Sequence, residues 1–181
     1  MDDRELVEAV TTGDRQAFRL LVDRESASIF RLCLRILGQV GEAEDAAQES
    51  FVIAYRALGT YRGDGPLGAW LARIAARHAL RQLGRRREAV ALESVAEPAA
   101  PGDRRIDPLA AALGAERQQA VRRAVASLPE PYRETVALRF FGELSLEEIA
   151  TATGRPLNTV KTHLRRGLLR LRDALAREVA A

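Results

Sequence analysis

The sequence predicts an all-α protein of two small helical domains joined by a flexible linker, with a helix-turn-helix in the C-terminal domain. Alanine, leucine, arginine and glutamate, which favour helix, dominate the 181 residues. Aromatic residues make up only 5% of the chain, and no segment shows a strand pattern. Residues 88–113 are Ala-, Pro- and acid-rich without a clear period, which is typical of a linker. The expected domains are therefore residues 1–87 and 114–181.

Three helices are expected in the N-terminal domain. Asp14 is expected to cap the first helix, which runs to about Leu37, and glycines mark the break after it. The second helix covers about 42–58 and the third about 67–87, with an ordered loop rich in Gly and Pro between them. Apolar residues recur along each helix, so the three could form one compact bundle. The residues expected to face its interior are Phe18, Leu21, Val22, Ile29, Leu32, Ile36, Ala46, Phe51, Ala54, Leu58, Leu71, Ile74, Ala75 and Leu83.

The C-terminal domain is expected to hold two helices ahead of the helix-turn-helix. They cover about 114–127 and 132–141, and a Leu-Pro-Glu break separates them. Ser145 followed by Glu148 fits a capping box, so the next helix begins there. Gly154 can take the left-handed conformation that ends this helix, and the proline after it suits the first turn of the last helix.

Two faces are expected on the last helix. The residues at helical spacing that should face the core are Val160, Leu164, Leu168 and Leu171. The residues of the opposite face, which can bond to base edges or phosphates, are Asn158, Lys161, Thr162, Arg165 and Arg166. Because this motif lays a helix in the major groove, DNA is the leading partner. The alternative is a solvated basic face on an ordinary helix hairpin.

An acidic face is expected on the second helix. Asp45, Gln48 and Glu49 lie at positions i, i+3 and i+4 and therefore share one side. This face could bind a basic helical surface on another protein. Acidic faces also simply keep proteins soluble, and charge alone favours that explanation.

The loop and third helix combine aromatic side chains with a basic stripe. Arg73, Arg77 and Arg81 repeat every four residues and so lie along one side of the helix. Tyr61 and Trp70 are close to them in sequence, and aromatic side chains near a basic surface can stack unpaired bases. Trp70 is more simply explained as a core residue.

Composition narrows the function further. The net charge of +3 is segregated: residues 51–87 and 113–181 are basic, whereas 1–50 and 88–112 are acidic. No stretch is apolar enough for a membrane span, and the acidic N-terminus lacks a signal-peptide core, so a cytoplasmic protein is expected.

Catalytic and metal-binding signatures are lacking in the sequence. There is no GxxxxGK[ST] loop and no Cys/His cluster, so no enzyme, catalytic residue, metal, cofactor or small-molecule substrate is expected. The single Cys33 has apolar neighbours and suits a core position better than a redox role. A lone histidine such as His78 is usually structural.

The combined motifs resemble bacterial RNA polymerase sigma factors of the extracytoplasmic-function (ECF) type, within the sigma-70 family. The resemblance covers about residues 18–87 and 124–175. The segments that carry it are LRILGQVGEAEDAAQESFVIAYRAL, AWLARIAARHAL, LPEPYRETVALRFFGELSLEEIA and TVKTHLRRGLLRLR. Their order and spacing together are specific, although each alone is weak.

The resemblance implies a promoter-recognition subunit without enzymatic activity, which binds core RNA polymerase and directs transcription of stress- or signal-responsive genes. By this likeness, Asp45, Gln48 and Glu49 match the polymerase-binding segment. Residues 61–66 match the loop that captures a flipped base of the minus-10 element, and residues 73–87 match the helix beside it. A dedicated anti-sigma protein is implied as a further partner.

The same resemblance assigns two sets of DNA contacts. The implied minus-10 contacts are Tyr61, Arg62, Asp64, Trp70, Arg73, Arg77 and Arg81, and the implied minus-35 contacts are Asn158, Lys161, Thr162, Arg165 and Arg166. The family often has Asn and Asp where this chain has Arg77 and Arg81, so phosphate contact could be stronger here. Thr153 stands where the family usually has Leu, and His163 where it often has Arg, so a less tightly packed turn is expected.

A conventional dimeric helix-turn-helix regulator, acting without replacing the sigma subunit, is the alternative. Such a regulator carries a sensor or receiver domain, often with strands. Residues 1–87 show neither a strand pattern nor a ligand-pocket motif, which favours the sigma factor.

Overall fold

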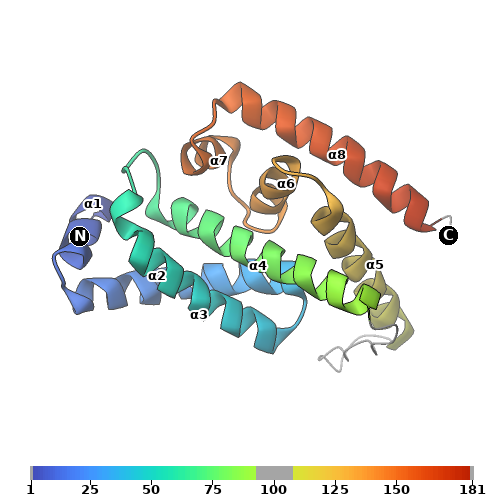
Figure 1. Cartoon of the computed structure of the whole chain (residues 1–181), viewed down its shortest axis with the longest axis horizontal. Helices are drawn as coiled ribbons and strands as arrows, with labels where there is room; N and C mark the ends of the chain where they lie inside the picture. Colours follow the sequence, from blue (N-terminus) through green and yellow to red (C-terminus); the bar gives the residue numbers. More distant parts are fainter. Residues whose placement is uncertain (1, 93–107, 180–181) are drawn as a thin grey trace.

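The computed structural model describes residues 2–92 and 108–179, and that part of the chain contains helices but no strands. The elements are α1 (Asp3–Thr11), α2 (Arg15–Leu37), α3 (Val40–Ala57), the short 3-10 helix η1 (Leu58–Thr60), α4 (Leu67–Leu92), α5 (Pro108–Ser127), α6 (Tyr132–Phe140), α7 (Leu146–Thr153) and α8 (Leu157–Val179). Helices α1 to α4 form one group, and α5 to α8 form the other, as Figure 1 shows. The predicted all-α fold is confirmed.

Local signals fix the N-terminal bundle. The Asp14 carboxylate accepts hydrogen bonds from the backbone N–H groups of Gln16 and Ala17, so α2 begins where the cap predicts. Gly38, with φ of 82°, ends the helix in the left-handed conformation. Small side chains make up much of the buried surface of α3 and α4, and small residues at a helix contact allow close packing. These buried alanines are Ala43, Ala46, Ala47 and Ala54 on α3 and Ala69, Ala72, Ala75, Ala76 and Ala79 on α4.

The helix-turn-helix forms with the predicted caps. Ser145 Oγ accepts from the Glu148 N–H at 3.1 Å, and Glu148 Oε2 accepts from the Ser145 N–H at 2.8 Å. Gly154 is left-handed, with φ of 65°. Further along, α8 lies so close to α6 that a Cβ on Gly167 would sit 2.8 Å from Val136 Cγ2. Gly167 therefore sets the separation of these two helices.

One core assignment on α8 is wrong. Leu168 was expected to face the core, but 39% of its surface is exposed. Val160 and Gly167 are buried, and Leu164 and Leu171 are partly buried against the core, so the inner seam follows positions 160, 164, 167 and 171. Residue 168 lies about 100° round the helix from residue 167, which turns its side chain away from α6.

One helix and two helix boundaries differ from the predictions. Helix α1 was not anticipated, although Asp2 and Glu5 form a capping box at its start. Helix α4 continues past residue 87, and α5 begins before residue 114, so both ends of the predicted linker are helical. Alanine and leucine are frequent in both extensions and favour helix. The rest of that predicted linker, residues 93–107, lies outside the described residues.

The two helical groups share a continuous core. Buried residues of α2, α3 and α4 contact buried residues of α5, α6, α7 and α8 in one cluster, which extends from Ile29 to Val160. Helix α4 is the member of the first group that contacts both α6 and α7 of the second group (Figure 1). The packing of the two groups therefore sets the position of the predicted minus-10 surface on α4 relative to the helix-turn-helix.

Candidate polymerase and nucleic-acid interfaces

The predicted acidic face lies on the outer side of α3. Asp45, Gln48 and Glu49 are all exposed, because alanines and Ser50 occupy the inner side. Val52 and Tyr55 continue this face and are exposed apolar residues that the sequence reasoning missed. Their spacing from Gln48, four and seven residues, was the signal that could have found them. A charged face that continues into exposed apolar side chains is suited to binding a protein.

The loop between η1 and α4 is held by its own aromatic residues. The Tyr61 hydroxyl donates to the backbone carbonyl of Gly65, and the Tyr61 ring meets Trp70 edge-on at a centroid distance of 5.9 Å. Both rings are half-buried, so Trp70 is not a fully buried core residue, and only part of its ring is accessible for stacking with a base. Burial also raises the pKa of Tyr61. Arg62 and Asp64 are exposed at the tip of the loop.

A hollow of about 430 Å³ lies beside this loop. Tyr61, Trp70 and Arg73 line one side of it. The opposite side is formed by the end of α7 and the turn after it, residues 151–154. The contact is close, since a Cβ on Gly65 would lie 2.5 Å from Thr151 Oγ1. The helix-turn-helix therefore faces the loop that is predicted to capture a base.

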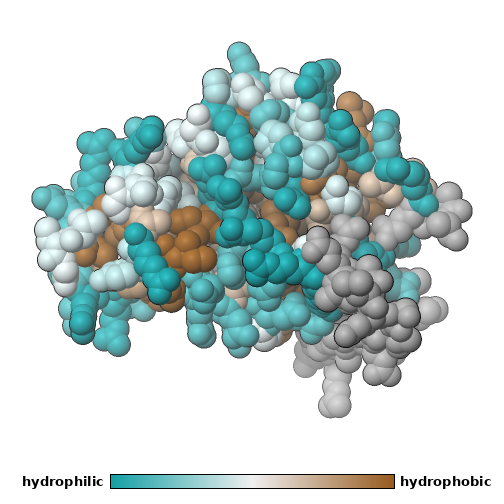
Figure 2. Space-filling view, in the orientation of Figure 1, coloured by the Kyte–Doolittle hydropathy of each residue, from teal (hydrophilic) through white to brown (hydrophobic). Residues whose placement is uncertain are grey.

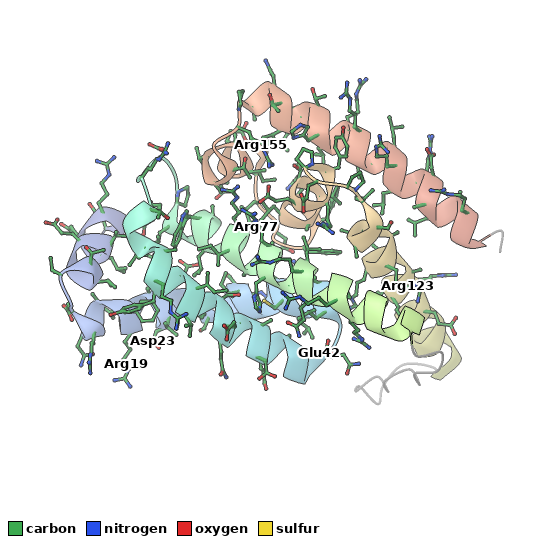
Figure 3. The ribbon with its side chains drawn as sticks, viewed as in Figure 1. Arg19, Asp23, Glu42, Arg77, Arg123 and Arg155 are labelled. Carbon is green, nitrogen blue, oxygen red and sulfur yellow. The ribbon has the colours of Figure 1, made fainter. Side chains whose placement is uncertain are left out.

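Two arginines of the basic stripe on α4 pair with a buried carboxylate. Glu134 on α6 has only 4% of its side chain exposed. Its Oε1 accepts from Arg73 Nε at 3.0 Å and lies 3.9 Å from Arg77 Nε, and its Oε2 lies 2.9 Å from Arg155 Nη2. Arg73 also donates to the Ala152 carbonyl at 3.0 Å. In Figure 3, Arg77 on α4 faces α6, and Arg155 lies at the turn before α8.

The two helical groups are joined by these four side chains. We call them the Glu134 cluster: Glu134, Arg73, Arg77 and Arg155. The sequence reasoning assigned Arg73 and Arg77 to DNA and missed Glu134. Its ion-pair partners lie 61, 57 and 21 residues away in the chain, so no local pattern signals them. Arg81, the third residue of the stripe, is exposed.

The predicted minus-35 face of α8 points outward. Asn158, Lys161, Arg165 and Arg166 are exposed, and Figure 2 shows hydrophilic residues over much of this helix. Thr162 is half-buried, and its hydroxyl donates to the Asn158 carbonyl at 2.9 Å. The four exposed side chains can therefore reach a ligand directly, whereas the Thr162 hydroxyl is engaged by the helix itself.

The two unusual residues near the turn pack in different ways. The Thr153 hydroxyl donates to the Ile149 carbonyl at 2.6 Å, which satisfies its polar group at a half-buried position. His163 meets the Tyr132 ring edge-on at 5.7 Å, and its Nδ1 is buried without a hydrogen-bond partner. Burial lowers the pKa of His163, and the nearby Arg155 and Arg166 lower it further. His163 is thus part of the α6–α8 packing.

A reactive thiol, a metal site and a membrane span were also sought within residues 2–92 and 108–179. Cys33 is a free thiol and fully buried, and burial raises its pKa to about 12, as a core position predicts. Among the described side chains, no group of three or more His, Cys, Asp or Glu residues could hold a metal ion. None of the helices in the described ranges has both the length and the apolar character that crossing a membrane requires.

Comparisons with known proteins identify a family and several relatives. Residues 21–89 match the family described as Sigma-70 region 2, and residues 118–171 match Sigma-70, region 4. The RNA polymerase sigma-H factor of Pseudomonas aeruginosa is 38% identical over 180 residues, which cover 96% of this chain and 91% of that protein. The ECF RNA polymerase sigma factor SigW of Bacillus subtilis is 31% identical over 183 residues, with 93% of this chain and 94% of that protein covered.

Solved structures are also similar. The structure of CnrH in complex with the cytosolic domain of CnrY matches with a TM-score of 0.61 and 25% identity, and covers 96% of this chain and 97% of that one. The sigma factor RpoE of Bartonella quintana, solved with the anti-sigma factor NepR, has a TM-score of 0.55 and 20% identity over 88% of this chain and 96% of its own, which shows a shared fold.

Proposed function

This chain belongs to the ECF sigma factors of the sigma-70 family, and we propose that it binds core RNA polymerase, recognises the minus-35 and minus-10 elements of promoter DNA and directs transcription initiation. The observation that carries the proposal is the outward face of α8, where Asn158, Lys161, Arg165 and Arg166 are exposed on the second helix of a helix-turn-helix. A helix in this position inserts its N-terminal half in the major groove. The minus-35 element is its proposed target.

Docking on polymerase is assigned to the outer face of α3. Asp45, Gln48 and Glu49 supply its charge and polarity, and Val52 and Tyr55 supply apolar area. The proposed partner surface is basic and helical, with apolar residues at its edge. Charge complementarity would speed association and fix the register, and the apolar pair would add contact area once docked.

Recognition of the minus-10 element is assigned to the loop after η1 and to α4. An unpaired base would enter the hollow beside Tyr61 and Trp70, and the α4 arginines would contact the phosphates. Because the turn after α7 lines the other side of this hollow and Glu134 pairs with Arg73, the two helical groups must separate before this surface can receive DNA. We place this separation at the step of polymerase binding, which holds the two groups apart.

The proposed regulator is an anti-sigma protein. CnrH, a structural relative of this chain, was solved with the cytosolic domain of CnrY. A polypeptide that binds the arrangement described here would keep the minus-10 surface covered. The chain itself is proposed to work in the cytoplasm, with no enzymatic activity and no cofactor.

Run-off transcription with purified core polymerase tests the function. We expect transcripts from promoters that carry both elements, and fewer transcripts when Arg165→Ala replaces the wild type. An Arg165 that contacts a base bidentately should contribute about 1–3 kcal/mol. Arg172→Ala, at an exposed position two turns further along α8, is the matched control. Absence of transcription with core polymerase, together with tight dimeric binding of a palindrome by the isolated protein, would instead indicate a conventional regulator.

A further inference from the structure

Helix α1 lies outside the residues that match the Sigma-70 region 2 model, which begin at residue 21. Its start is nevertheless defined by a capping box. Asp2 Oδ1 accepts from the Glu5 N–H at 2.8 Å, and Glu5 Oε2 accepts from the Asp2 N–H at 2.8 Å. Figure 1 shows α1 at the same end of the molecule as the loop between η1 and α4. The contacts between α1 and that loop suggest what this helix does.

Asp3 connects α1 to the start of α4. Its Oδ2 accepts from the Leu67 backbone N–H at 2.7 Å, and its Oδ1 accepts from Arg24 Nη2 at 2.8 Å. The Leu67 N–H belongs to the first turn of α4 and has no partner within that helix. Asp3 therefore caps α4 from 64 residues away, and its negative charge suits a helix N-terminus.

A small core beneath the loop supplies a second connection. Leu6 and Val10 of α1 are buried with Leu21, Leu58 and Leu67. Leu58 begins η1, the element before the loop, and Leu67 is the first residue after the loop. Tyr61 and Trp70 pack against the same cluster. Helix α1 thus holds both ends of the loop and supports its two aromatic rings.

The tip of the loop provides a third contact. Gly63 has φ of 74° and approaches α1 so closely that a Cβ there would lie 2.8 Å from Arg4 Nε. A residue with a side chain would be strained in this conformation as well as crowded. The loop is therefore in contact with α1 at its start, its tip and its end.

The geometry points to α1 as the element that positions residues 61–66 for the unpaired minus-10 base, with Asp3 as the positioning residue. This inference rests on the proposed function, because it concerns the same loop. A loop held in its binding conformation needs less ordering when the base enters, so binding is tighter. Without the Asp3 carboxylate, the Leu67 N–H loses its partner and Arg24 is left with Glu25 alone, so α1 no longer holds the start of α4 and the loop has to be ordered by the DNA.

Two variants and two controls test the inference in the full chain. Asp3→Ala removes both hydrogen bonds, and Asp3→Asn keeps an oxygen for the Leu67 N–H but loses the charge that pairs with Arg24. Asp3→Glu keeps the charge and should restore part of the wild-type behaviour. Glu8→Ala removes a carboxylate from an exposed position on the same helix and serves as the control.

The first measurement needs no DNA. Trp70 is the only tryptophan of the chain, so its fluorescence reports on the loop directly. We expect Asp3→Ala to increase the acrylamide quenching constant of Trp70 by about twofold, with Asp3→Asn in between and Glu8→Ala unchanged, while circular dichroism shows retained helix. Equal quenching in wild type and Asp3→Ala would overturn the positioning role. This outcome does not depend on whether the proposed promoter function is correct.

The second measurement uses holoenzyme and a single-stranded oligonucleotide that carries the minus-10 element. We expect Asp3→Ala to weaken its binding by about five- to tenfold, as the loss of one capping interaction implies, with assembly on core polymerase unchanged. Wild-type holoenzyme that fails to bind the oligonucleotide contradicts the proposed function and this inference together. Wild-type holoenzyme that binds it no better than Asp3→Ala overturns only the role of α1.

Discussion

The Glu134 cluster gives the sharpest prediction about how the two helical groups are held together. Glu134→Gln keeps the shape of the side chain but removes the charge that pairs with Arg73 on α4 and Arg155 before α8. We expect the contact between the groups to weaken, because the amide cannot replace a carboxylate between guanidinium groups.

The size of the effect follows from burial. Removing one partner of a fully buried ion pair costs about 3–5 kcal/mol. Here the arginines remain partly hydrated, with exposed side-chain fractions of 28% for Arg73, 25% for Arg155 and 58% for Arg77. Arg73 also keeps its bond to the Ala152 carbonyl. We therefore expect the share that joins the groups to be about 1–2 kcal/mol, which shifts the equilibrium roughly five- to thirtyfold toward separation.

Energy transfer between two dyes measures this shift. Thr12→Cys and Arg172→Cys place attachment points at exposed positions in the two groups. Native Cys33 stays unlabelled, because it is buried and its pKa is raised to about 12. Glu134→Gln should lower the transfer efficiency and raise the affinity of the isolated protein for minus-10 DNA. Glu130→Gln, which removes the charge of an exposed pair with Arg133 just before α6, should leave both unchanged. Transfer efficiency in Glu134→Gln equal to that of wild type would refute the role of the cluster.

Three further predictions concern docking, packing and pH. Asp45→Arg or Glu49→Arg should abolish pull-down by core polymerase with helix content retained, while the control Glu116→Arg on α5 should bind normally. If Asp45→Arg and Glu49→Arg both still bind, this face is not the docking surface. Gly167→Ala should destabilise the protein by about 1–3 kcal/mol in denaturant unfolding, because the added Cβ would meet Val136 Cγ2 at 2.8 Å, whereas Gly84→Ala has open space and should be neutral or stabilising. Burial lowers the pKa values of His78 and His163, so the unfolded chain binds protons more readily. The free energy of unfolding should hold steady above about pH 7 and fall as the pH drops below about 6.5, and a variant with glutamine at both histidines should lose that part of the slope.

The sequence predicted the elements that are specified locally. Asp14 caps α2, and Ser145, Glu148 and Gly154 define α7 through contacts within a few residues. These signals lie next to each other in the chain, so pattern and cap chemistry were sufficient. The two faces of α8 could also be predicted, apart from Thr162, which is half-buried, and Leu168, whose place in the seam is taken by Gly167.

Features that depend on distant residues could not be predicted. Helix α1 spans 9 residues, shorter than an isolated helix needs to be stable, so it depends on packing against α2 and η1. Glu134 is buried because arginines from α4 and from the α7–α8 turn neutralise it. The bond from Leu67 to Asp3 likewise joins segments 64 residues apart. Each depends on which surfaces meet in the folded protein.

Mapping transcript 5′ ends after overexpression of this chain in cells tests the central claim most directly. We expect new start sites that share a minus-10 and a minus-35 element at a fixed separation, and we expect the variant Arg165→Ala to produce fewer of them. Overexpression that creates no new start sites, or that only changes the output of existing ones around a shared palindrome, would contradict it.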